Sequence, residues 1–109
     1  MSKRPLERLE KSVTQDNLWI YILKIMKEEK SVYPYDLNKK IKERFGFKPG
    51  NVTVYFVLKR LELGGYVKKT RTSKSKGPER TNYAITKKGL KEIKNALPLL
   101  KNIIKNIQQ

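Results

Sequence analysis

A helix with a clear beginning and end occupies the middle of the sequence and constrains how the rest can fold. Pro49 and Gly50 precede it, and Gly64-Gly65 follows it, as expected where a helix ends on a glycine in the left-handed conformation. Between these limits, apolar residues recur at the i, i+3, i+4, i+7 spacing of a single helical stripe: Val54, Val57, Leu58 and Leu61. Residues 51–63 are therefore predicted to form a helix with one face in a core.

The opposite face of this helix is unusual for a helix that only covers a core. It combines short polar groups, aromatic rings and cations, and no acid precedes Glu62. The residues are Asn51, Val52, Thr53, Tyr55, Phe56, Lys59 and Arg60. Hydrogen-bonding groups and cations suit base edges and phosphates, so this face is predicted to contact duplex DNA.

The net charge of the chain favours the same partner. Lysine and arginine total 26 against 10 acids, which gives a net charge of +16 and a pI of about 10.1. A lysine-rich thermophilic surface is one interpretation, but ion-pair networks need acids, and most cations here have none. Such an excess repels itself unless a polyanion offsets it, which favours nucleic acid over a membrane surface or an acidic protein.

Missing residue types exclude several classes of protein. The chain has no cysteine and no histidine, so disulfides, thiolate metal sites and the commonest general base are excluded. No cofactor or metal is expected, and without a carboxylate pair of evident spacing or a glycine-rich phosphate loop an enzyme is the weakest hypothesis. No run of about 18 apolar residues and no signal sequence is present, so the chain is expected to be cytoplasmic, nucleoid-associated and not membrane-bound.

Two helices are predicted before the central one. Residues 18–30 are apolar on two sides, which indicates the middle of the fold, contact with a second chain, or both. The next helix begins at Pro34 and ends at Gly46, and its apolar residues recur at i, i+4, i+8: Leu37, Ile41 and Phe45. Residues 47–50 then form the turn into the central helix, a spacing typical of helix-turn-helix proteins.

Beyond Gly65 the sequence pattern changes to that of β-strands. Residues 66–71 and 81–86 are rich in aromatic and β-branched side chains, and a polar link with a Gly-Pro turn joins them. The hairpin carries many cations against the single acid Glu79: Lys68, Lys69, Arg71, Lys74, Lys76 and Arg80. Helices followed by a basic hairpin predict a winged helix. Because so many cations stand against one acid, we expect the hairpin to contact phosphates, and a hairpin tip that is polar only because it is solvated is the alternative.

The last helix is predicted to begin at the cap Thr86 and to run to about Ile107. Its apolar residues follow one another at spacings of 3, 4, 3, 4 and 3: Leu90, Ile93, Leu97, Leu100, Ile104 and Ile107. This a/d seam predicts pairing of helices between two chains, and packing on the helix's own domain is the alternative. The stripe is too narrow for a membrane-surface helix. Pro98 removes a backbone donor, so a kink or a brief break is expected near Leu97.

Four segments resemble the PadR family of winged-helix transcriptional regulators over about residues 15–95. They are Val32-Tyr33-Pro34-Tyr35-Asp36-Leu37, the run from Asn51 to Glu62, Gly65-Tyr66-Val67, and Tyr83-Ala84-Ile85-Thr86-Lys87-Lys88-Gly89. Phe56 departs from the family pattern, which usually has proline after the tyrosine, and the C-terminal region is a single helix.

The resemblance implies a homodimer that binds operator DNA, with the third helix in the major groove and the wing beside it. The first and last helices would form the dimer interface. It also allows a small-molecule effector, for which nothing in this sequence argues.

Two groups of candidate site residues follow. The DNA-binding candidates are Lys48, Asn51, Thr53, Tyr55, Lys59, Arg71, Lys74, Lys76 and Arg80. The dimer-interface candidates are Trp19, Leu90, Ile93, Leu97, Leu100, Ile104 and Ile107. Asn51 has the alternative role of a helix cap, Tyr55 that of packing against the wing, and Trp19 that of stacking on a ligand.

The sequence therefore predicts a mainly α fold with a small β-hairpin wing. It divides into a basic N-terminal extension (1–13), a winged-helix DNA-binding domain (14–86) and a C-terminal dimerisation helix (87–109). The predicted function is that of a dimeric, sequence-specific regulator of transcription that binds double-stranded DNA. Because a net charge of +16 exceeds what reading one operator needs, a non-specific architectural protein of the nucleoid and an RNA-binding factor remain alternatives.

Overall fold

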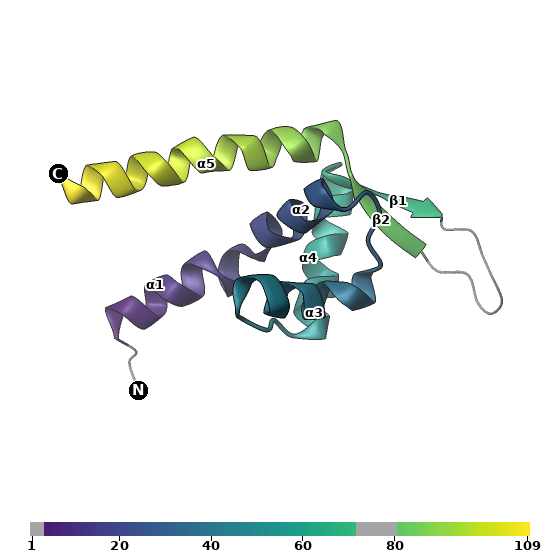
Figure 1. Cartoon of the computed structure of the whole chain (residues 1–109), viewed down its shortest axis with the longest axis horizontal. Coiled ribbons are helices and arrows are strands. Elements are labelled where there is room, and N and C mark those ends of the chain that lie inside the picture. Colours follow the sequence, from purple (N-terminus) through teal and green to yellow (C-terminus); the bar gives the residue numbers. More distant parts are fainter. Residues whose placement is uncertain (1–3, 72–80) are drawn as a thin grey trace.

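Helices make up most of the fold, and one antiparallel hairpin interrupts them before the last helix (Figure 1). The computed structural model describes residues 4–71 and 81–109. The elements are α1 (Pro5–Val13), the 3-10 turn η1 (Gln15–Asn17), α2 (Leu18–Glu28), α3 (Pro34–Phe45), α4 (Asn51–Leu63), β1 (Val67–Arg71), β2 (Thr81–Ile85) and α5 (Lys87–Gln108). The mainly helical fold class with a hairpin is confirmed.

Helix α2 lies at the centre of the core. It packs against α3, α4, α5 and β2. Its buried side chains are each 1% exposed or less: Leu18, Ile22, Leu23, Ile25 and Met26. Each such side chain contributes about 1.5–3 kcal/mol when it leaves water. This central position accounts for the two apolar sides predicted for residues 18–30.

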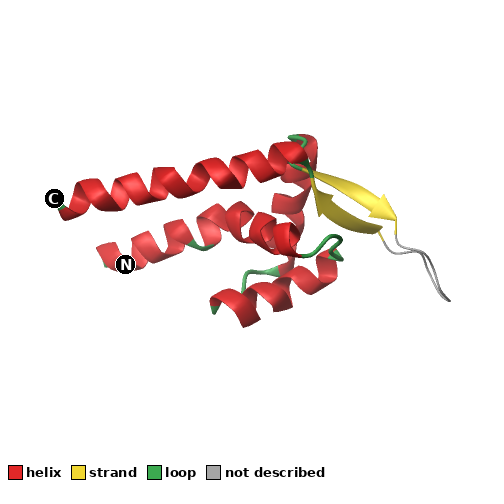
Figure 2. Cartoon of the chain, turned by 45° about the horizontal axis from the view of Figure 1, so that its top comes forward, coloured by secondary structure: helices red, strands yellow, loops and turns green. Residues whose placement is uncertain are grey.

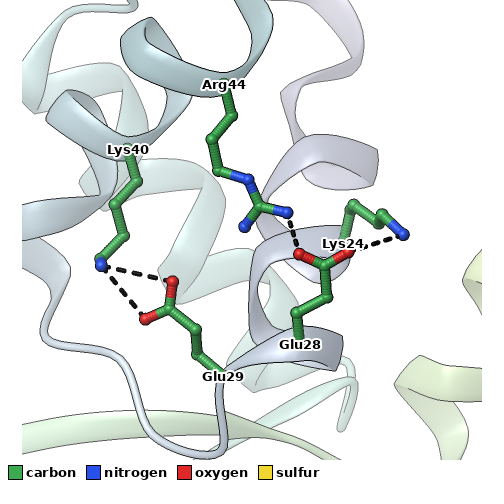
Figure 3. Close-up of polar contacts among 5 residues, drawn as sticks. All are labelled: Lys24, Glu28, Glu29, Lys40 and Arg44. Atoms are coloured by element: carbon green, nitrogen blue, oxygen red, sulfur yellow. Dashed lines mark hydrogen bonds and ion pairs between the residues drawn. The ribbon is translucent and has the colours of Figure 1, made fainter.

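A cluster of ion pairs joins α3 to the end of α2 (Figure 3). Glu28 pairs with Arg44 and, at 2.9 Å, with Lys24 on its own helix. Glu29 lies 3.1 Å from the ammonium group of Lys40. The side chains are 30–45% exposed, so each pair contributes at most about 1 kcal/mol, and their main effect is to fix the position of α3 on α2.

Helix α4 ends in a Schellman motif, as its two glycines predict. The N–H of Gly65 donates to the carbonyl of Glu62 at 3.0 Å, and the N–H of Tyr66 donates to that of Leu61 at 2.9 Å. Gly65 has φ of 82°, a conformation that side chains rarely adopt. The turn leads the chain directly from α4 into β1.

The hairpin is held by the link between α2 and α3. The register of β1 and β2 runs from Val67 opposite Ile85 to Arg71 opposite Thr81. On the other side of β2, Val32 and Tyr83 exchange two backbone hydrogen bonds of 2.9 and 2.8 Å. The hairpin is thereby anchored to the helical core at its base.

Helix α5 begins at the predicted cap. The Thr86 hydroxyl accepts a hydrogen bond of 3.1 Å from the N–H of Gly89. The helix then continues through Pro98 (Figure 1), so of the two alternatives expected near Leu97, a kink or a brief break, the break does not occur. Pro98 is exposed, and a long helix tolerates the loss of one backbone hydrogen bond on its solvent side.

Helix α1 and the C-terminal half of α5 extend from the core toward the same side of the molecule (Figures 1 and 2). The Tyr21 hydroxyl donates to the carbonyl of Val13 at 2.6 Å and ties α1 to α2. The Tyr21 ring packs edge-on against Phe45 and Phe47, at centroid distances of 4.9 and 5.0 Å. Residues of the predicted N-terminal extension thus form a helix from Pro5 onward.

Candidate nucleic-acid interface

The outer face of α4 is uncovered. Its inner stripe is in the core, with Val54 and Leu58 at 3% and 0% exposed. Asn51, Thr53 and Tyr55, the three predicted contacts near the helix start, are all exposed. The helix packs against α2, α3 and β1, so this outer face is the side on which a large ligand can lie.

Asn51 is engaged by the neighbouring helix. It is the first residue of α4 and Gly50 is the N-cap, so the alternative role of Asn51 as a cap is wrong. The Asn38 side-chain N–H donates to Asn51 Oδ1. Asn38 is only 7% exposed, and its own Oδ1 has no hydrogen-bond partner among the described residues. The contact fixes the orientation of the Asn51 amide at the edge of the outer face.

Tyr55 borders a hollow between α3 and α4. The hollow has a volume of about 320 Å³, and its lining includes Tyr33, Tyr35 and Asn51. The Tyr55 ring is 53% exposed, and the ammonium group of Lys59 lies 5.6 Å from its centroid. The aromatic ring and the cation therefore lie close together on the surface of α4.

Glu62 connects α4 to the hairpin. Its carboxylate lies 3.7 Å from Lys59 and 3.8 Å from Lys69 on β1. Burial, followed by the negative charge of Glu62, raises the pKa of Tyr83 on β2, while Lys59 acts in the opposite direction. The sequence identifies Glu62 as the first acid of the helix and as the end of the family-like run from Asn51, but it predicts no contact with the hairpin.

The basic residues near α4 are only partly described. Lys48 is exposed in the turn before α4, and Lys68 and Lys69 are exposed on β1. Arg71 is the last residue of β1, and its backbone pairs with Thr81. The predicted wing contacts Lys74, Lys76 and Arg80 lie outside the described residues.

A second uncovered surface runs along α5, and it is wider than the predicted seam. Ile93 is 6% exposed and packs within its own chain. The other seam residues are 39–78% exposed: Leu90, Leu97, Leu100, Ile104 and Ile107. Leu99 and Ile103 are also exposed, at 61% and 46%, and the a/d pattern missed them. Their i, i+3 and i, i+7 spacing from Ala96 could have found them.

Trp19 lines a groove of about 520 Å³ between α2 and α5. The groove is lined mainly by apolar residues, Ile20, Leu97 and Leu100 among them. The Trp19 indole N–H donates to Asn17 Oδ1 at 3.3 Å. Helix α1 extends to the same side of the molecule as the C-terminal half of α5 (Figure 1). It carries exposed apolar residues of its own: Leu6, Leu9 and Val13.

The described part of the chain contains neither a candidate metal site nor a candidate membrane-spanning helix. Within residues 4–71 and 81–109, no three acidic side chains are grouped so as to hold a metal ion. In the same part of the chain, none of the helices has the length and hydrophobicity needed to cross a bilayer.

Three packed helices followed by a hairpin and an exposed outer face on the third helix define a winged helix-turn-helix protein. The transcriptional regulator PadR-like family matches residues 22–95, about two-thirds of the chain. The chain therefore belongs to the PadR-like family. This is a family of transcriptional regulators and not of enzymes.

Solved structures support the same assignment. A PadR-like transcriptional regulator from Bacillus cereus is 31% identical, with 84% of this chain and 91% of that chain covered and a TM-score of 0.65. A transcriptional regulator from Clostridium thermocellum is 26% identical, with 89% and 92% covered and a TM-score of 0.77. Bacillus subtilis PadR in complex with operator DNA is 24% identical, with 73% and 47% covered and a TM-score of 0.65. No curated protein sequence matches significantly.

Proposed function

We propose that the chain is a dimeric transcriptional regulator that recognises a specific double-stranded DNA sequence. Helix α4 enters the major groove, and the basic wing, of which β1 and β2 are the described part, follows the backbone or the minor groove. The relative from Bacillus subtilis, which has the same fold, forms a complex with operator DNA. With DNA as its partner, the protein associates with the nucleoid.

The outer face of α4 is the observation that carries this proposal. A recognition helix must pack on the core with its inner face and leave its outer face exposed, because its side chains have to reach base edges about 8.5 Å deep in the groove. Helix α4 meets this requirement: Val54 and Leu58 fix it to the core, and Thr53 and Tyr55 are exposed. The N-terminal half of the helix bears these exposed side chains, which is the half that contacts bases in helix-turn-helix proteins.

Electrostatics supply most of the affinity. Ion pairs in the described part of the chain involve six cations: Lys11, Lys24, Lys40, Arg44, Lys59 and Lys69. With a net charge of +16, most of the basic side chains cannot have an acid of their own. Phosphates provide the missing counter-charge, and each contact releases a condensed counterion.

The apolar faces of α1 and α5 support the dimer. Leu97, Leu100 and Ile104 are 40–56% exposed in the single chain, and burying one such side chain is worth about 1.5–3 kcal/mol. A second copy that packs on α5 and α1 covers these faces. Such a dimer presents two α4 helices, and the half-sites that helix-turn-helix dimers bind lie about 34–36 Å apart, one turn of DNA, or a multiple of it.

Binding to duplex DNA as a function of salt tests the proposal. If six or more phosphates are contacted, affinity should fall by about 10³-fold or more between 50 and 200 mM salt. Absence of binding at 50 mM salt would contradict it.

Selection of bound duplexes from a random pool then separates the alternatives. A selected site with two half-sites, preferred over random duplex, agrees with a regulator. A preference ratio near one identifies a non-specific architectural protein. A preference for structured RNA over duplex DNA identifies an RNA-binding factor.

A further inference from the structure

Two apolar side chains occupy the centre of the outer face of α4. Val52 is 69% exposed and Phe56 is 64% exposed. They are four residues apart, so they lie one above the other on the helix surface. At 3.6 residues per turn, both lie within about 20° of the direction opposite to the core residue Val54. Val52 and Phe56 therefore point more directly away from the core than Asn51 or Tyr55.

The cations around Val52 and Phe56, and the absence of nearby acids on α4, favour a polyanion as the partner of this pair. Lys59 and Arg60 lie on the next turn of the same helix, and Lys48 is exposed just before it. No acid occurs on α4 before Glu62, so an acid-poor, cation-flanked apolar spot faces outward. A single exposed valine or phenylalanine needs no explanation, but an adjacent pair at the front of a helix between cations fits an apolar group on a negatively charged ligand.

Duplex DNA presents one apolar group in its major groove, the 5-methyl group of thymine. Valine and phenylalanine can neither donate nor accept hydrogen bonds, so no other base edge gives them a favourable contact. The two side chains are separated by about 6 Å along the helix axis, less than two steps of about 3.4 Å between base pairs. Both can therefore contact thymines within the same short run of base pairs.

We propose that Val52 and Phe56 read the methyl groups of thymines, and that they are specificity-determining residues of this chain. The inference rests on the proposed binding of α4 in the major groove. It also gives a role to Phe56, which stands where the family pattern has proline. A·T pairs are then recognised through apolar contacts along the middle of the outer face of α4. Hydrogen bonds to DNA come from Asn51, Thr53 and Tyr55 on the two sides of this face.

Replacement of thymine by uracil tests this directly. Uracil lacks the 5-methyl group and keeps every phosphate and every hydrogen-bonding group of the base. The wild-type protein should bind a selected duplex about fourfold more weakly for each contacted thymine that is replaced, which corresponds to the transfer of one buried methyl group. If selection gives no preferred site, these residues determine no specificity and the inference is overturned.

Variants then assign the effect to the two side chains. Val52→Ala and Phe56→Ala should each bind the thymine and uracil duplexes with a smaller ratio than wild type. Leu63→Ala is the matched control, because Leu63 is 88% exposed on the same side of α4 but two turns further along. It should keep the wild-type ratio.

The failure of this inference is distinguishable from that of the proposed function. Equal affinity of wild type for thymine and uracil duplexes overturns the inference and leaves DNA binding intact. An unchanged ratio in both Val52→Ala and Phe56→Ala overturns it as well. Binding to neither duplex at 50 mM salt contradicts the proposed function and the inference together.

Discussion

Asn38 is a buried polar side chain whose amide donates to Asn51 and whose own carbonyl oxygen has no partner in the described residues. Asn51→Ala should therefore lower the free energy of unfolding by about 1–3 kcal/mol, because the buried Asn38 amide loses its acceptor. Urea denaturation followed by circular dichroism measures the loss.

A second substitution separates this structural role from base reading. Asn38→Leu combined with Asn51→Ala removes both polar groups and should recover most of the lost stability. If the double variant is as unstable as Asn51→Ala alone, the hydrogen bond is not the cause. Loss of preference for the selected duplex in the stable double variant would indicate that Asn51 also contacts a base.

Tyr83 should make stability depend on pH at the alkaline end. Its phenol is 4% exposed, and burial together with the charge of Glu62 raises its pKa. The folded state holds this proton more tightly than the unfolded chain, whose tyrosine pKa is about 10. The contribution is therefore fully present below pH about 10 and is lost as pH rises through the folded pKa.

Comparison of variants isolates this contribution from lysine titration, which all of them share. The difference in unfolding free energy between Tyr83→Phe and wild type should move in favour of the variant as pH rises above about 10. Tyr35→Phe is the control, because Tyr35 is 76% exposed. A difference for Tyr83→Phe that does not change with pH would contradict the prediction.

Single residues mark the limit of what the sequence could predict. The positive φ of Gly46 and Gly65 follows from helix-stop signals, since only local backbone chemistry is involved. The contacts of Asn51 with Asn38 on α3 and of Glu62 with Lys69 on β1 could not be predicted, because they depend on how the elements pack. The outward direction of Phe56 follows from helical periodicity, but its exposure does not.

At the scale of elements, α5 is docked through a close approach of two backbones. A Cβ atom on Gly89 would lie 2.3 Å from the carbonyl oxygen of Tyr66 and 2.7 Å from Ile85. Alanine in the interior of a helix normally gains about 1 kcal/mol over glycine. Overpacking costs about 1–3 kcal/mol, so Gly89→Ala should be destabilising in spite of its better helix propensity.

Thermal unfolding decides the sign of this change. Asn95→Ala, at an exposed position of the same helix, is the control and should be neutral or slightly stabilising. A Gly89→Ala variant as stable as the control would show that α5 shifts freely on the turn after α4.

The elements themselves were largely predictable, because each carries its own periodicity and end signals. The hairpin strands, the cap Thr86 and the helix 51–63 appear as predicted. At Pro98 the sequence left a kink and a brief break open, and the helix continues, since an exposed proline removes one hydrogen bond without ending a helix. The central place of α2 was one of two compatible alternatives, and it could be established only from the packing of the other elements around this helix.

At the scale of the whole molecule, the apolar faces of α1 and α5 extend beyond the core that the single chain builds. The sequence predicted the seam on α5 but not its full width, since Leu99 and Ile103 fall outside an a/d pattern. A face this wide suits a helix that packs against more than one neighbour. In the proposed dimer these neighbours are α5 and α1 of the second copy, and the two α4 helices are thereby set at a fixed spacing.

Breaking the dimer should therefore weaken DNA binding without touching the DNA-binding surface. Leu97→Lys with Leu100→Lys places two cations in the seam, and light scattering at micromolar concentration should give the mass of a monomer. Although the variant carries more positive charge, its affinity for a duplex with two half-sites should fall, because each half-site is bound separately. Asn95→Lys with Asn102→Lys adds the same charge at exposed polar positions of α5 and should keep both the dimer and the affinity. A monomeric mass for the wild-type protein, or unchanged affinity in a monomeric variant, would contradict the proposed arrangement.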